Sequence, residues 1–128
     1  MTFAYWCVLV GALMPILWTG TAKWGGPNKM PTAANHAPRE FLSGLQGRQK
    51  RADWAQQNAF EAFPAFAAAV IIAQSAAASQ ISVNRLAAVW LVARFLHGLF
   101  YVLDWSHARS LAYFVGMGCV IGLFIAAA

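Results

Sequence analysis

Four long apolar segments, separated by little other chain, constrain the fold of this protein more than any other feature. Each is near or above the roughly 20 residues that an α-helix needs to cross the hydrocarbon of a bilayer. Only 10% of the residues are charged, against about 25% in a soluble domain, so the composition is that of a membrane protein. The segments are Thr2–Ala22, Ala52–Ala78, Val83–Leu103 and Ser110–Ala128.

These segments predict an all-α integral membrane protein, folded as an antiparallel bundle of four transmembrane helices. The helices are expected at about residues 2–22, 49–78, 83–104 and 108–127. So little chain remains outside them that residues 1–128 are expected to form one membrane domain. A single four-helix unit has few places to bury polar side chains, which favours an oligomer.

The basic residues predict how the chain is oriented in the membrane. By the positive-inside rule, the first and third connections are cytoplasmic and both termini lie outside. The net charge of +5 therefore indicates membrane topology and not nucleic-acid binding. Six of the nine basic residues lie between the first and second segments: Lys23, Lys29, Arg39, Arg48, Lys50 and Arg51.

The first connection, residues 25–47, is the only long one, and prolines and glycines interrupt it. A short helix is expected within it at Pro38–Leu45. Connections of this length are often binding loops, but a solvated linker explains the composition equally well.

The remaining chemistry-bearing residues show no metal-ligand spacing, and no metal site is predicted. Cys7 and Cys119 both lie inside apolar segments, where a cysteine behaves as a small hydrophobic side chain. The three histidines, His36, His97 and His107, are scattered along the chain.

A polar stripe at the start of the second segment is the first candidate for a site. Arg51, Trp54, Asn58 and Glu61 follow one another at steps of three, four and three, which places them on one face of a helix. An acid and an arginine are tolerated at membrane depth only where they face a protein interior or a wet cavity. A neighbouring stripe of small residues is suited to close helix packing: Ala52, Ala55, Ala59 and Ala62.

A second polar stripe runs along the third segment at the same spacing: Arg94, His97, Tyr101 and Asp104. It is either the wall of a site or a charge pair that satisfies itself inside the bundle. Arg109 follows a very short connection, and an interface anchor would also explain an arginine at that position.

The second segment reads Arg51-Ala52-x-x-Ala55-x-x-Asn58-x-x-Glu61-x-x-Pro64-x-Phe66, which resembles the signature of the MAPEG family, the membrane-associated proteins in eicosanoid and glutathione metabolism. Upstream, Asn35-x-x-Pro38-Arg39 is similar to the loop of bacterial members, which implies a bacterial inner membrane. The run Arg94-x-x-His97-x-x-x-Tyr101, followed by Ala108-Arg109-Ser110, resembles the third and fourth helices of the prostaglandin-forming members.

The resemblance implies a homotrimer with three glutathione sites between neighbouring subunits, open to the cytoplasm. By the same resemblance, Asn58 and Glu61 hold the glutathione peptide, Tyr101 lines the site, and Arg109 stabilises the thiolate. The alignment at Arg109 needs a one-residue gap. Trp54 stands where the eukaryotic glutathione-using members carry a basic residue.

The chemistry of glutathione fits these residues independently of the resemblance. Glutathione has two carboxylates, an ammonium group and a thiol, and it needs arginines, an acid and a cation near the sulfur. A fixed positive charge lowers the pKa of a thiol from about 8.5, and arginine keeps its charge while doing so. The residues that can provide these groups are Arg51, Arg94 or Arg109, together with Glu61 and Asn58.

Three readings of function remain. The leading one is an integral-membrane glutathione-dependent transferase or peroxidase, with glutathione as co-substrate and a hydrophobic electrophile or lipid hydroperoxide as acceptor. In it, Arg109 is catalytic, and the binding residues are Arg51, Asn58, Glu61, Arg94 and Tyr101. The alternative, suggested by Trp54, is a non-catalytic lipid- or small-molecule-binding protein on the same trimeric scaffold. In a third reading, the stripes only lock a trimer through pairs such as Arg51–Glu61 or Arg94–Asp104.

Overall fold

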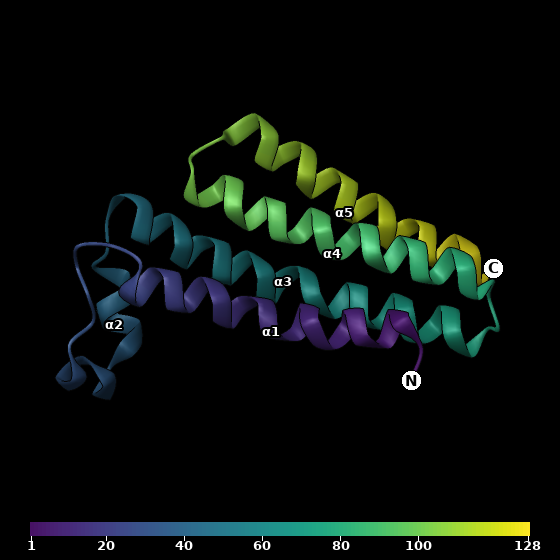
Figure 1. Cartoon of the computed structure of the whole chain (residues 1–128), viewed down its shortest axis with the longest axis horizontal. Helices are drawn as coiled ribbons and strands as arrows, with labels where there is room; N and C mark the ends of the chain where they lie inside the picture. Colours follow the sequence, from purple (N-terminus) through teal and green to yellow (C-terminus); the bar gives the residue numbers. More distant parts are fainter.

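The computed structural model describes residues 1–128 and is entirely helical (Figure 1). Four helices are long, and a 3-10 helix and a short α-helix lie in the first connection. The short helix expected there ends two residues early, at Ser43. The elements in chain order are α1 (Phe3–Trp24), η1 (Thr32–His36), α2 (Pro38–Ser43), α3 (Gly47–Ser75), α4 (Gln80–Val102) and α5 (Ser106–Ala127).

The long helices form two antiparallel pairs, α1 with α3 and α4 with α5, and α3 packs against α4 (Figure 1). Both chain termini lie at one end of the molecule. The opposite end, called here the loop end, carries the first connection and the turn between α4 and α5.

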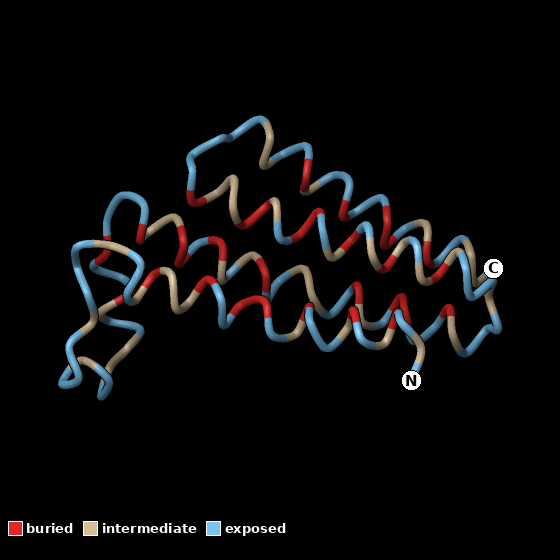
Figure 2. The backbone as a smooth tube through the Cα atoms, in the orientation of Figure 1, coloured by how far each residue is buried: buried red, intermediate tan, exposed pale blue.

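Three helices are long and apolar enough to cross a membrane, namely α1, α4 and α5. Exposed residues recur along all the long helices (Figure 2). Many of them are large and hydrophobic, for example Leu13 on α1, Val92 on α4 and Phe114 on α5. The longest helix, α3, does not meet the same criterion, although a span is predicted there. Its first half carries the polar stripe, which lowers its hydropathy.

The buried core consists of two clusters of hydrophobic side chains. The helices that contribute to each cluster show where the bundle is less tightly filled. One cluster draws on all four long helices and includes Phe66, which stacks on Trp90 with ring centroids 3.6 Å apart. The cluster at the loop end contains residues from α1, α2, α3 and the last turn of α4, but none from α5. The alanine stripe contributes Ala52, Ala55 and Ala59 to it. The side of α3 that faces α5 is therefore less filled at the loop end.

Two helices end in left-handed residues, which corrects two sequence expectations. Helix α3 stops at Ser75, earlier than expected, because Ala77 has φ of 53° and the Ala78 N–H returns to the Ala73 carbonyl at 3.0 Å. Asp104 has φ of 63°, and the Trp105 N–H donates to the Phe100 carbonyl at 2.9 Å. Asp104 therefore lies beyond α4, outside the helical stripe to which its spacing assigned it.

A buried glutamine, Gln49, helps to fix the first connection to the bundle. The Gln49 amide nitrogen donates to the Ala22 carbonyl at 2.8 Å and to the Asn28 carbonyl at 2.9 Å. The Asn28 N–H donates back to the Gln49 amide oxygen at 3.1 Å. Gly26 must be glycine-sized, because an added Cβ would lie 2.5 Å from that oxygen. Gln49 thus joins the end of α1, the connection and the start of α3.

Candidate functional site

The candidate site lies between α3, α4 and α5 in the half of the bundle nearest the loop end. Three cavities meet there, and Asn58 lines all of them. We call them the inner cavity of about 130 Å³, the outer cavity of about 310 Å³, and the Arg109 cavity of about 280 Å³.

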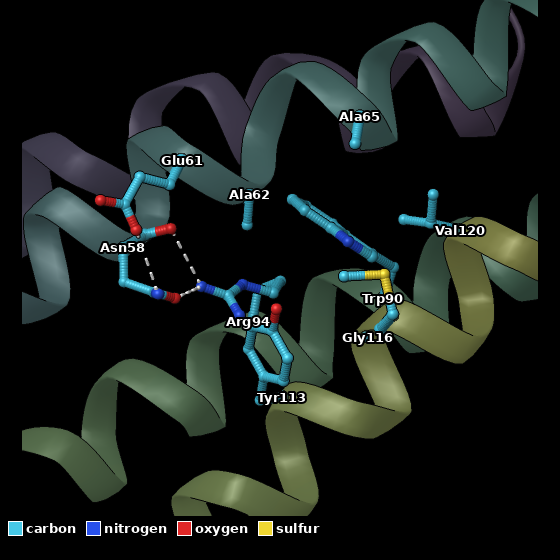
Figure 3. Close-up of a pocket in the computed structure, with 10 residues that line it drawn as sticks. Asn58, Glu61, Ala62, Ala65, Trp90, Arg94, Tyr113, Gly116 and Val120 are labelled. Carbon is cyan, nitrogen blue, oxygen red and sulfur yellow. Dashed lines mark hydrogen bonds between the residues drawn. The ribbon is translucent and has the colours of Figure 1, made fainter.

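A chain of polar contacts crosses from α4 to α3 at the centre of the site (Figure 3). Arg94 is only 4% exposed, and its Nη2 donates to both the backbone carbonyl, at 3.3 Å, and the side-chain Oδ1 of Asn58. The Asn58 amide nitrogen in turn approaches a Glu61 carboxylate oxygen at 3.5 Å. Gly116 makes room for this arginine, since a Cβ there would lie 3.3 Å from Arg94 Cδ. The contacts hold the amide and carboxylate in defined positions.

The inner cavity is polar at one end and apolar over the rest of its wall (Figure 3). Asn58, Glu61, Arg94 and Tyr113 supply the polar groups. The Arg94 Nε is buried there without a hydrogen-bond partner. The remaining lining residues are Ala62, Ala65, Trp90, Gly116, Met117 and Val120.

The Arg109 cavity brings the start of α5 against the end of α4. The Arg109 guanidinium lies 4.4 Å from the centroid of the Tyr101 ring, within the range of a cation–π contact. His97 is buried beneath, with its ring 5.7 Å from that of Tyr101. The half-buried Arg109 is therefore a positive charge held by an aromatic surface. The other lining residues are Asn58, Ser110, Tyr113 and Phe114.

The outer cavity is the most open part of the site and faces away from the bundle. Trp54, Gln57, Asn58, Glu61 and Tyr101 line it, so four of its five residues come from α3. The exposed Trp54 ring lies 6.3 Å from the Tyr101 ring and forms one side of the opening.

The structure brings together five of the six predicted site residues: Asn58, Glu61, Arg94, Tyr101 and Arg109. The sixth, Arg51, lines none of these cavities. Its Nε donates to the Val102 carbonyl at 3.3 Å, where a cation compensates the negative end of α4.

The pairs suggested for a purely structural role do not form within the chain. Arg94 bonds to Asn58 and not to Asp104, and Arg51 bonds to a backbone carbonyl and not to Glu61. The only ion pair is between Lys50 and the buried Asp53, at 3.3 Å.

Tyr113 and Trp90 are two of the lining residues that were not among the predicted site residues. A signal for Tyr113 was available, because Arg109, Tyr113, Gly116 and Val120 follow at steps of four, three and four and share one face of α5. Trp90 lies one turn before Arg94 on α4, inside an apolar run that gave no reason to select it.

The chemistry that this site offers is binding and electrostatic stabilisation by fixed charges. It combines a carboxylate, two amides, two guanidinium groups and two phenols around small cavities. No group of three His, Cys, Asp or Glu side chains is placed to hold a metal ion.

Comparison with protein-family models matches residues 3–128, nearly the whole chain, to the model described as the MAPEG family. No curated protein and no solved structure matches the chain.

Proposed function

Because this chain belongs to the MAPEG family, an integral-membrane family associated with glutathione and eicosanoid metabolism, we propose that it binds glutathione and directs the thiolate at hydrophobic electrophiles or lipid hydroperoxides. The protein would then be a membrane transferase or peroxidase with glutathione as co-substrate. One observation carries the proposal: three cavities share Asn58 and gather one carboxylate, two amides and two guanidinium groups from α3, α4 and α5.

Three groups of glutathione have counterparts in the site, namely its ammonium, its peptide and its thiol. The Glu61 carboxylate, at the open side, is assigned the ammonium group. Asn58 hydrogen-bonds the peptide, and Arg94 fixes the orientation of its amide. The guanidinium of Arg109 is assigned the sulfur, where its charge favours the thiolate. Tyr101 positions Arg109 and lines both open cavities.

We further propose that α3 crosses the membrane as a fourth span of this single domain and faces a second copy of the chain. Gln57, Phe60 and Glu61 on α3 are exposed in one chain. An exposed acid at membrane depth needs a protein or wet neighbour. This supports a homotrimer with its sites between subunits. The basic first connection supports a cytoplasmic loop end in a bacterial inner membrane.

The direct test is glutathione-dependent turnover by the detergent-purified protein. Cumene hydroperoxide and benzyl chloride serve as hydrophobic acceptors that report peroxidase and transferase chemistry separately. Turnover above the uncatalysed rate with either acceptor supports the proposal. No turnover with both, over a range of glutathione concentrations, argues against it.

Glu61→Gln is expected to weaken glutathione binding, because the neutral amide cannot pair with the ammonium group. Loss of a hydrogen bond to a charged group corresponds to a decrease in affinity of about 10- to 100-fold. Isothermal titration with glutathione measures the change, and size-exclusion chromatography checks the assembly. Glu40→Gln is the matched control, because Glu40 is exposed on α2 and far from the cavities. Intact affinity with a disrupted oligomer would instead support a structural role for Glu61.

A separate observation favours the non-catalytic alternative. The outer side of α4 and α5 carries a groove of about 490 Å³ lined by ten hydrophobic residues. They are Ala88, Val89, Val92, Ala93, Leu96, Phe100, Ala108, Leu111, Ala112 and Val115. If the protein only binds lipid, mass spectrometry of the purified complex will find retained lipid, and glutathione will neither bind nor react.

A further inference from the structure

Tyr113 lines two of the three cavities of the site. Apart from Asn58, it is the only residue that lines both the inner cavity and the Arg109 cavity. It comes from α5, one turn after Arg109, and its ring lies 6.2 Å from that of His97. The Tyr113 side chain therefore borders both the cavity assigned to the sulfur and the inner cavity.

The polar groups at that end of the inner cavity include donors that nothing in the chain satisfies. Arg94 uses Nη2 for Asn58, but its buried Nε has no acceptor. The Tyr113 hydroxyl takes part in none of the hydrogen bonds of the site, and Figure 3 shows it on the same side of the cavity as the guanidinium. Two unused donors at one end of an apolar cavity match an acceptor oxygen on a largely apolar molecule.

The size of the inner cavity limits what enters it. Its volume of about 130 Å³ is well below the roughly 300–1,000 Å³ of a typical small-molecule pocket. It can hold the reacting end of a hydrophobic molecule, with a few carbons against Ala62, Ala65 and Val120, but not a whole lipid. The bulk of the acceptor must remain outside.

We propose that Tyr113 is a proton donor to the oxygen that leaves the acceptor, so that the site serves electrophiles that release oxygen, such as hydroperoxides. This inference rests on the proposed function and adds a further catalytic residue for its hydroperoxide acceptors. The thiolate sulfur would lie in the Arg109 cavity and the leaving oxygen in the inner cavity. Tyr113 lies between them.

For a hydroperoxide the step balances as follows. The glutathione thiolate attacks the distal oxygen, a sulfur–oxygen bond forms, and the oxygen–oxygen bond breaks. The proximal oxygen leaves with the electron pair and takes the phenolic proton of Tyr113, which gives the alcohol and glutathione sulfenic acid. A second glutathione reduces the sulfenic acid to the disulfide and water, and a solvent proton restores the phenol.

The neighbouring guanidinium assists this transfer. A phenol is a stronger acid than an aliphatic alcohol, so proton transfer to a leaving alkoxide is favourable. Arg94 is held by Asn58, and its fixed charge stabilises negative charge on the leaving oxygen without reorganisation during the reaction.

The experiment compares Tyr113→Phe with the unmodified protein on two acceptors that differ in their need for a proton. With cumene hydroperoxide, kcat is expected to fall about 100-fold, the low end of the range for loss of a general acid. With benzyl chloride, kcat is expected to fall far less, since chloride leaves without a proton. Tyr5→Phe is the matched control, because Tyr5 packs against the core cluster at the opposite end of the bundle.

A second measurement separates acid catalysis from a structural effect of the same variant. Along a series of hydroperoxides whose alcohols differ in acidity, the Tyr113→Phe rate should depend more steeply on the leaving group than the unmodified rate. Equal losses on both acceptors, no loss on either, or identical leaving-group dependence would overturn the role of Tyr113. Absence of glutathione turnover in the unmodified protein would overturn the proposed function, and this inference with it.

Discussion

Arg109→Ala is expected to lower kcat with glutathione by about 100- to 1000-fold, the loss seen when a single fixed group that stabilises developing charge is removed. The reason is the protonation state of the glutathione sulfur. A free thiol is mostly protonated at neutral pH, and only the thiolate is a strong nucleophile. The Arg109 guanidinium, held 4.4 Å from the Tyr101 ring centroid, is the cation assigned to shift that balance.

The helices should remain assembled in this variant, because Arg109 makes no ion pair within the chain. Steady-state turnover together with size-exclusion chromatography tests both statements. Arg85→Ala is the matched control, since Arg85 is exposed near the start of α4, away from the loop end. Full turnover in Arg109→Ala would remove Arg109 from the mechanism.

Gly98→Ala is expected to give the largest loss of stability among single-methyl additions. An added Cβ on α4 would lie 2.2 Å from Cε2 of the indole ring of Trp18, a buried residue of α1. A rigid ring cannot move aside as a flexible chain end can, so the helices must separate. Overpacking of this kind lowers the free energy of unfolding by about 1–3 kcal/mol, and the severity of this overlap places it at the upper end.

Thermal unfolding in detergent measures the effect as a decrease in Tm. Gly20→Ala provides the contrast, because a Cβ there meets nothing within 4 Å and alanine favours a helix over glycine by about 1 kcal/mol. Gly20→Ala should therefore leave Tm unchanged or raise it. Equal Tm values for the two variants would contradict the packing of Trp18 against α4.

The placement of Asn58 and Glu61 side by side was predictable because it depends on a short-range rule. They are three positions apart on one helix, and helical geometry alone sets their relation, which the structure shows as a contact of 3.5 Å. The burial of Ala52, Ala55 and Ala59 follows from the same periodicity. Local spacing is thus sufficient wherever a helix continues without interruption.

Relations across a helix end could not be predicted in this way. The spacing of Arg94, His97, Tyr101 and Asp104 suggested one continuous stripe, but Asp104 adopts a left-handed conformation just beyond α4. Residue spacing does not predict where the chain leaves the helix and changes direction. The same change of direction places Arg109 over the Tyr101 ring. The contact between Arg51 and the Val102 carbonyl is likewise tertiary, because it depends on where α4 ends relative to α3.

Tyr113 shows a different limit. Its position one turn after Arg109 was visible in the sequence, but an aromatic residue in an apolar segment is usually a core or lipid-facing side chain. Only the cavities on either side of it indicate a chemical role. Buried polar groups without partners, such as the Arg94 Nε, are also invisible until the side chains are placed.

The measurement that tests the central claim most directly is ultraviolet difference absorption of the detergent-purified protein on addition of glutathione near neutral pH. A bound glutathione with an activated sulfur predicts a thiolate band that saturates with concentration and is absent in Arg109→Ala. No band at millimolar glutathione, or an equal band in Arg109→Ala, would contradict a site in which Arg109 stabilises the thiolate.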